Sequence, residues 1–167
     1  MFNVAIITLS DKGYNGQRED ITGKKLTAFI NNEKDYEVKY YNMIPDDKTM
    51  LKEEIIKLCD LNNIDLILTN GGTGFSKRDI TPEATKEIIE REIPGISEYI
   101  RMKSSEIVKR AILSRGVSGI RKNTVIINLP GSPKGAIESI EFIIDVIGHG
   151  IEILKGEAVE CANDRQA

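Results

Sequence analysis

The chain has 167 residues, of which 40% are hydrophobic and 29% charged, and its formal net charge is −3. This length is typical of one domain with a core of its own, whereas the acidic balance and the 5% aromatic content argue against a nucleic-acid-binding protein. No apolar run reaches the roughly 20 residues of a membrane span, and Met1 leads directly into a strand-like segment rather than a signal peptide. Cys59 and Cys161 match no metal-binding or redox spacing, which suits a reducing cytoplasm.

Short apolar runs that predict strands alternate along the chain with amphipathic runs that predict helices. The strand-like runs are rich in β-branched residues, and most have the pattern of strands covered on both faces. In chain order, strands are predicted over residues 3–9, 36–44, 64–69 and 124–129. Helices are predicted after Asp20, over residues 48–61, from Thr81 to before Pro94, over residues 96–110 and over residues 133–147.

This alternation predicts an α/β fold with three layers, α/β/α, in which a mostly parallel sheet carries helices on both faces. We expect Asp20 and Thr81 to cap helices, with Pro82 at the first helical position of the second. The composition shows no linker or repeat, so we expect one domain over residues 1–160 and a short polar tail over residues 161–167. In such sheets ligands bind outside the carboxyl ends of the strands.

A glycine-rich segment, Asn70-Gly71-Gly72-Thr73-Gly74, follows one of these predicted strands. Three glycines in four positions permit positive φ angles and a close approach of backbone N–H groups to a ligand, as in phosphate-binding nests. The alternative is a tight turn, for which one or two glycines would be enough. The sequence contains neither GxxxxGK[ST] nor GxGxxG, so neither a Walker loop nor a dinucleotide fingerprint is predicted.

A second Gly/Pro segment, Pro130-Gly131-Ser132-Pro133, ends the predicted strand at residues 124–129 and leads into a helix. Its backbone N–H groups and the helix dipole favour an anion, and the hydroxyl of Ser132 adds a donor. A rigid strand-to-helix turn is the alternative. Two glycine-containing segments at strand ends together favour a ligand site more strongly than either one alone.

Acidic residues accompany two of the predicted strand ends. Asp79 lies between the glycine-rich segment and a predicted helix, and Asp46 and Asp47 follow the strand at residues 36–44. Mg²⁺ prefers one or two carboxylates together with substrate phosphates, so these side chains are candidate ligands. The residues alone leave two alternatives open: Asp79 as a loop residue that bonds its own backbone, and Asp46 or Asp47 as a helix N-cap.

Basic residues concentrate between positions 101 and 122, where Glu106 is the single acid. This excess favours an anionic ligand nearby, with a solvated helix face as the alternative. Arg115 and Arg121 lie outside the predicted helix and are the better candidates for ligand contact. His149 is the only histidine and has no catalytic partner pattern near it, so we expect a structural or surface role.

Four longer segments complete the pattern: VAIITLSDKG from Val4, TNGGTG from Thr69, SKRDITPEA from Ser76 and ILSRGVSGIRKNTVIINLPGSPK from Ile112. Together, and in this order, they resemble the Mog/MoaB family of molybdenum-cofactor proteins over essentially the whole chain. The resemblance implies a molybdopterin-binding domain that forms a homotrimer or a hexamer. It also implies the Mg²⁺-dependent conversion of ATP and molybdopterin to adenylyl-molybdopterin and pyrophosphate, with a molybdenum insertase as a partner.

The same resemblance assigns roles to residues. Asp79 of the RDxTP motif is expected to be catalytic, Asp46 is the second family acid, and both are expected Mg²⁺ ligands. The expected substrate- and phosphate-binding residues are Ser10, Asp11, Gly71, Gly72, Thr73, Gly74, Thr81, Pro130, Gly131 and Ser132.

Two functions of different classes stay open on the sequence. The retained acids favour a molybdopterin adenylyltransferase, whereas the compact chain is also compatible with a non-catalytic MoaB-like protein that binds or carries molybdopterin. An oligomeric scaffold is the weaker third alternative. We expect a cytoplasmic protein with ATP and molybdopterin as ligands, subunit contacts through the apolar positions of residues 96–112, and no nucleic-acid or membrane partner.

Overall fold

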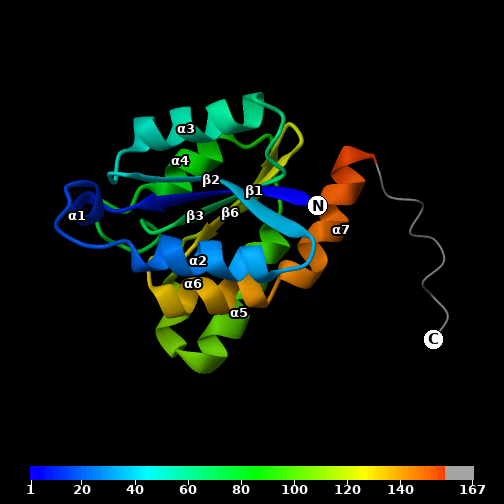
Figure 1. Cartoon of the computed structure of the whole chain (residues 1–167). Coiled ribbons are helices and arrows are strands. Elements are labelled where there is room, and N and C mark those ends of the chain that lie inside the picture. The colour runs from blue at the N-terminus through cyan, green and yellow to red at the C-terminus, as the bar shows by residue number, and fades with distance from the viewer. Residues whose placement is uncertain (157–167) are drawn as a thin grey trace.

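The structure is a computed structural model that describes residues 1–156; the expected polar tail, with Cys161, lies outside the described residues. One sheet of six strands has helices on both faces, which confirms the predicted three-layer α/β/α fold (Figure 1). The strands are β1 (Phe2–Leu9), β2 (Tyr36–Ile44), β3 (Leu66–Asn70), β4 (Arg91–Glu92), β5 (Ser118–Arg121) and β6 (Thr124–Leu129). The helices are α1 (Asp11–Tyr14), α2 (Ile21–Asn32), α3 (Lys48–Asp60), α4 (Thr81–Ile88), α5 (Pro94–Ile107), the 3₁₀ helix η1 (Lys109–Leu113), α6 (Pro133–Glu141) and α7 (Ile144–Lys155).

The strand order, β2-β1-β3-β6-β5-β4, places a reversal of winding next to β1. The strands β2, β1, β3 and β6 are parallel, and β5 and β4 add an antiparallel edge. Thr8 of β1 is in register with Asn70 of β3, which is in register with Leu129 of β6. The carboxyl ends of three neighbouring strands therefore lie level at one edge, beside the switch point where open α/β sheets bind ligands.

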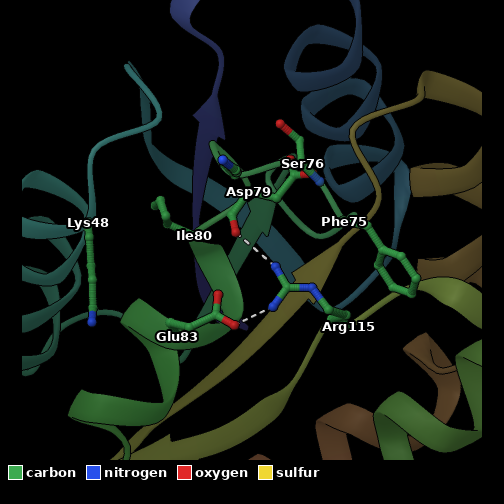
Figure 2. Close-up of a pocket in the computed structure, with 8 residues that line it drawn as sticks. Lys48, Phe75, Ser76, Asp79, Ile80, Glu83 and Arg115 are labelled. Atoms are coloured by element: carbon green, nitrogen blue, oxygen red, sulfur yellow. Dashed lines mark hydrogen bonds and ion pairs between the residues drawn. The ribbon is translucent and has the colours of Figure 1, made fainter.

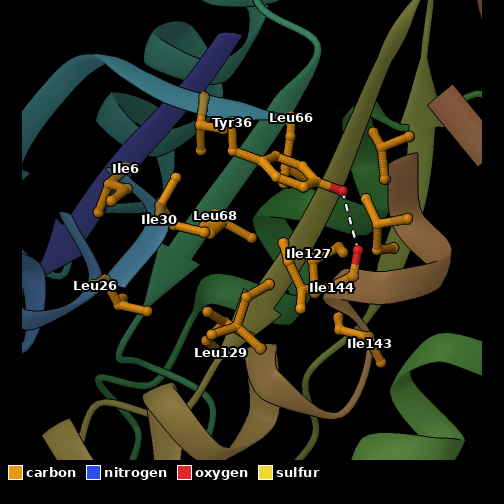
Figure 3. Close-up of a cluster of buried hydrophobic side chains, with 14 of the residues drawn as sticks. Ile6, Leu26, Ile30, Tyr36, Leu66, Leu68, Ile127, Leu129, Ile143 and Ile144 are labelled. Carbon is orange, nitrogen blue, oxygen red and sulfur yellow. Dashed lines mark hydrogen bonds between the residues drawn. The ribbon is translucent and has the colours of Figure 1, made fainter. Parts of the chain in front are cut away.

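Alternate residues of the central strands supply two hydrophobic clusters, one on each face of the sheet. Val4 and Ile6 of β1 pack in the cluster covered by α2, α5, α6 and α7, and Ala5 and Ile7 pack in the cluster covered by α3 and α4 (Figure 1). Figure 3 shows the first cluster, in which the Tyr36 hydroxyl donates to the Ile144 carbonyl at 3.0 Å. Burial on both faces explains why these strands have continuous apolar runs.

Several elements differ from the sequence-based expectation. The helix predicted over residues 133–147 is two helices, α6 and α7. The sequence did not indicate the break because the apolar stripe of Ile140, Ile143 and Ile144 continues across it. The strands β4 and β5 were not predicted, because with two and four residues they are too short to show a period-2 pattern. The sequence predicts no helix or strand between residues 10 and 19, and the structure has the one-turn helix α1 there. Within residues 1–156, no helix is both long enough and apolar enough to cross a bilayer.

Candidate functional site

A cavity of about 410 Å³ opens at the carboxyl edge of the parallel strands. Its walls come from the ends of β1, β2, β3 and β6 and from the start of α2. Seven of the residues singled out from the sequence line it, namely Ser10, Asp46, Gly71, Gly72, Asp79, Gly131 and Ser132. The fold thus brings together four loops that are far apart in the sequence.

A second cavity, of about 610 Å³, adjoins the same loops on the side of α5 and η1. Thr73, Gly74 and Pro130 line this second cavity, and Ser132 lines both. Asp11 and Thr81 line neither cavity, and instead each contacts a residue that does. The site residues expected from the sequence therefore fall on two adjoining cavities and on their supports.

The backbone of the glycine-rich loop has a shape that side chains would prevent. Gly71 has φ +100° and Gly72 has φ +64°, and a Cβ on Gly71 would lie 2.6 Å from the carbonyl oxygen of Leu9. Residues with a Cβ rarely adopt φ values in this range. Glycine is therefore needed here for both conformation and space, as a nest-forming loop requires.

Thr81 supports this loop and does not cap α4, so the expectation that it caps this helix was wrong. Its hydroxyl donates to the Gly71 carbonyl at 2.9 Å, and its backbone N–H donates to the Gly72 carbonyl at 3.1 Å. Ile80 occupies the N-cap position without a side-chain hydrogen bond, and Thr81 is the first residue of α4, ahead of Pro82. Because α4 begins at Thr81 itself, the threonine is one residue past the N-cap position, and its hydroxyl proton holds the loop instead.

The second loop touches the first. A Cβ on Gly131 would lie 3.2 Å from the Cα of Gly71, and the Gly71 N–H donates to the Leu129 carbonyl at 3.2 Å. The hydroxyl of Thr22 in α2 donates to the Gly131 carbonyl at 2.8 Å. Ser132 caps α6, since its oxygen accepts from the Gly135 N–H at 3.2 Å, while its own proton can still be donated to a ligand.

Asp46 and Asp11 form two reciprocal hydrogen bonds, in each of which the backbone N–H of one residue donates to the carboxylate of the other. The Asp11 N–H donates to the Asp46 carboxylate at 3.1 Å, and the Asp46 N–H donates to the Asp11 carboxylate at 3.0 Å. Arg78 makes two hydrogen bonds to Asp11, at 3.0 and 2.8 Å, and these lower the pKa of the Asp11 carboxyl. Asp47 is the N-cap of α3, which leaves Asp46 free of that role.

Asp79 lies at the end of the loop that follows the glycines. Its carboxylate accepts from the Ser76 N–H at 2.8 Å, and its own N–H donates to the Ser76 carbonyl at 3.0 Å. These bonds are the local ones that the alternative interpretation expected, yet Asp79 also lines the 410 Å³ cavity together with Asp46. The two interpretations are therefore compatible: the loop orients a carboxylate that faces the cavity.

The two acids form a donor set that fits a divalent cation. Burial raises the pKa of Asp46, and the nearby negative charges of Asp11 and Asp79 raise it further. A divalent cation between such carboxylates would offset their repulsion. Within residues 1–156, no group of three or more His, Cys, Asp or Glu side chains is placed to hold a metal. Mg²⁺ is often held by one or two carboxylates with phosphate oxygens completing the shell.

Of the basic residues singled out, Arg115 reaches the site and Arg121 does not. The Arg115 guanidinium lies between Asp79 and Glu83 in a hollow that Lys48 and Phe75 also line (Figure 2). Arg121 instead donates to the Ile88 carbonyl at 3.0 Å, on the far end of α4. His149 is exposed on α7, in agreement with the expected surface role.

Sequence reasoning gave no site role to several polar residues of the cavity wall, among them the buried pair Thr8 and Asn70. The Asn70 side-chain amide donates to the Thr8 hydroxyl at 2.9 Å, both are buried, and both line the 410 Å³ cavity. The available signal was a polar residue at the end of an apolar strand, where the chain reaches the carboxyl edge of the sheet. Thr22, which holds Gly131, gave no such signal because it lies within an ordinary amphipathic helix.

Comparison with known proteins identifies the family of this chain, whose site combines glycine-containing loops with two acidic residues. The family described as "Probable molybdopterin binding domain" matches residues 5–149, and the chain belongs to this family. The molybdopterin adenylyltransferase of Helicobacter pylori (strain ATCC 700392 / 26695) is 36% identical over 162 residues, which cover 95% of this chain and 90% of that protein. The molybdopterin adenylyltransferase of Escherichia coli (strain K12) is 35% identical over 175 residues, which cover 95% of this chain and 88% of that protein.

The solved structures agree with this assignment. The structure described as the molybdopterin biosynthesis enzyme MoaB of Thermus thermophilus has a TM-score of 0.88 and 44% sequence identity to this chain. The alignment covers 96% of this chain and 100% of that one. The resemblance found in the sequence and the predicted fold class are both confirmed.

Proposed function

We propose that this chain is a molybdopterin adenylyltransferase that converts ATP and molybdopterin to adenylyl-molybdopterin and pyrophosphate with Mg²⁺. The proteins of Helicobacter pylori and Escherichia coli that support this proposal carry that name. One structural observation carries the argument: two touching glycine-containing loops share a cavity with Asp46 and Asp79. This arrangement suits a reaction in which two phosphorylated substrates are bound side by side.

In the proposed reaction, the terminal phosphate of molybdopterin attacks the α-phosphorus of ATP. A bond forms from the phosphate oxygen to that phosphorus, and the bond to the β-phosphate oxygen breaks, so that pyrophosphate leaves. Such a transfer needs positioning and charge neutralisation more than a protein nucleophile. The loop N–H groups and the N-terminus of α6 would hold the phosphates, and Ser132, which borders both cavities, lies where the two substrates would meet.

Asp46 and Asp79 are the side chains that would hold Mg²⁺. When bound, the ion supplies positive charge that neutralises phosphate oxygens. The remaining work belongs to the protein chain: Thr81 fixes the glycine-rich loop, Thr22 fixes the second loop, and Ser76 orients the Asp79 carboxylate. The site would thus be organised by groups that need no change of protonation at neutral pH.

The test is pyrophosphate release from ATP, molybdopterin and Mg²⁺. We expect adenylyl-molybdopterin and pyrophosphate in equal amounts, and no product with excess EDTA. Asp79→Asn should keep the fold and lower kcat by about 10²–10³-fold, as for the loss of one preorganised electrostatic group. The matched control is Asp47→Asn, which makes the same chemical change beside Asp46 and retains a good N-cap. An unchanged kcat in Asp79→Asn at saturating Mg²⁺ would refute the assignment of Asp79 as a catalytic residue.

The second candidate function is a non-catalytic protein that binds or carries molybdopterin. The sequence leaves this function open, because the compact chain is also compatible with a MoaB-like protein that binds molybdopterin without adenylylating it. The same assay separates the two functions. A carrier would bind molybdopterin, measured by calorimetry, and release no pyrophosphate at any Mg²⁺ concentration.

The proposal includes a homotrimer, or a hexamer built from it, in the cytoplasm, with a molybdenum insertase downstream. The support for subunit contacts is a set of exposed apolar side chains on α5 and η1. They are Tyr99, Met102, Ile107, Ile112 and Leu113. Burying such a surface against a second copy would remove it from water, which favours association.

A further inference from the structure

Arg115 joins the two ends of the loop that carries Asp79, here called the Asp79 loop (residues 74–79). Its Nε donates to the Gly74 carbonyl at 2.7 Å, and its Nη2 donates to the Asp79 carbonyl at 2.8 Å. Its backbone N–H donates to the Thr73 carbonyl at 2.9 Å, one residue before the loop begins. A single residue therefore closes the loop at both ends. Figure 2 shows the contact at the Asp79 end.

The third contact of the guanidinium fixes this loop to a helix. Nη1 of Arg115 pairs with the carboxylate of Glu83, which lies in the first turn of α4 (Figure 2). Burial acts to raise the pKa of Glu83, but the hydrogen bond and charge of Arg115 help to hold it below its ordinary value. The pair is therefore ionised at neutral pH, and the loop is anchored to α4.

Arg115 acts from outside the cavity that holds the two acids. It lines the neighbouring hollow with Lys48 and Phe75, and it is not among the residues that line the 410 Å³ cavity. The Ser76 N–H sets the direction of the Asp79 carboxylate relative to its own loop. Arg115 sets the position of that loop relative to the glycines and α4. The Ser76 N–H thus orients the carboxylate within its loop, and Arg115 holds the loop itself.

We propose that Arg115 is a positioning residue that keeps the Asp79 loop closed and so holds the Asp79 carboxylate in the cavity with Asp46. The inference rests on the proposed function, in which Asp79 is catalytic. The planar guanidinium presents its donors to two carbonyls and a carboxylate in a rigid fork, whereas a lysine ammonium keeps the charge but not this geometry. Geometry, and not charge alone, is then what Arg115 provides.

The test compares Arg115→Lys and Arg115→Gln with Arg121→Lys, a control whose guanidinium also bonds a backbone carbonyl but lies away from the site. We expect both Arg115 variants to lower kcat by about 10–100-fold, because a misplacement of about 1 Å can have that effect. The KM for ATP should change by less than about threefold, since the groups that bind ATP are retained. The Mg²⁺ concentration for half-maximal rate should rise, and Arg121→Lys should match wild type in all three.

A double-mutant cycle with Asp79→Asn distinguishes this inference from the proposed function. If Arg115 acts through Asp79, adding Arg115→Lys to Asp79→Asn should lower kcat by less than about twofold more. Full activity in Arg115→Lys, or losses that multiply in the double variant, overturns the inference while leaving the proposed function intact. Full activity in Asp79→Asn overturns the catalytic role of Asp79, and the inference falls with it, whereas a wild-type protein that releases no pyrophosphate overturns the proposed function itself. If a thermal melt shows that Arg115→Gln does not fold, the result for Arg115→Lys decides the test.

Discussion

The two loops that meet at the carboxyl edge are held in contrasting ways. In the first, at residues 71–79, Gly71 and Thr73 are buried, and Thr81 and Arg115 bond to its carbonyls. In the second, at residues 130–132, Gly131 and Ser132 are exposed. Its side-chain supports are the hydroxyl of Thr22 and the cap that Ser132 itself forms.

This contrast shows how one site can be built from parts of unequal stability. The glycine-rich start of the first loop, residues 71–73, is packed against the interior, so a change in its backbone must move buried neighbours. The second loop lies on the surface, where water can replace a lost hydrogen bond. We therefore expect matched substitutions to have large effects in the first loop and small effects in the second.

The largest difference is expected between Gly71→Ala and Gly131→Ala. Gly71→Ala combines a φ of +100° with a Cβ 2.6 Å from the Leu9 carbonyl oxygen, and should lower the free energy of unfolding by about 2–5 kcal/mol. Gly131 has no positive φ, and its Cβ would lie 3.2 Å from the Gly71 Cα. Gly131→Ala should stay within about 1 kcal/mol of wild type. Urea unfolding of both variants measures the difference, and equal losses would contradict the contrast.

The sequence could predict where these loops lie but not how they are held. The glycine spacing and the position after an apolar strand located Gly71–Gly74, and the alternation of elements placed both loops at one edge of the sheet. The contacts of Thr81 and Arg115 depend on residues 10 and 41 positions away, Gly71 and Gly74, which no local pattern encodes. The capping rule even gave the wrong role for Thr81, because the helix begins at Thr81 itself and Ile80 occupies the N-cap position.

A smaller difference is expected between Thr81→Val and Thr22→Val, which each remove one hydroxyl of nearly the same shape. Thr81 is fully buried, and its loss leaves the Gly71 carbonyl without this donor, which should lower the free energy of unfolding by about 1–3 kcal/mol. Thr22→Val affects the exposed Gly131 and should lower it by about 0.5–1.5 kcal/mol. Denaturant unfolding at one pH tests the order. A greater loss in Thr22→Val would show that the second loop is the more firmly held.

The smallest effect concerns Asp46, on the cavity wall that faces the first loop. Burial, with the charges of Asp11 and Asp79, raises the pKa of Asp46 in the folded protein above its ordinary value of 3.8. The folded state therefore favours the protonated carboxyl, and stability from this group is lost as the pH rises through the raised value. Asp46→Asn should increase the free energy of unfolding at pH 7 and match wild type more closely at pH 3.5, with Asp47→Asn as the control. A variant less stable than wild type at pH 7 would contradict this sign. The expected gain, together with a loss of turnover, would mean that the acid is kept for the reaction at the expense of stability.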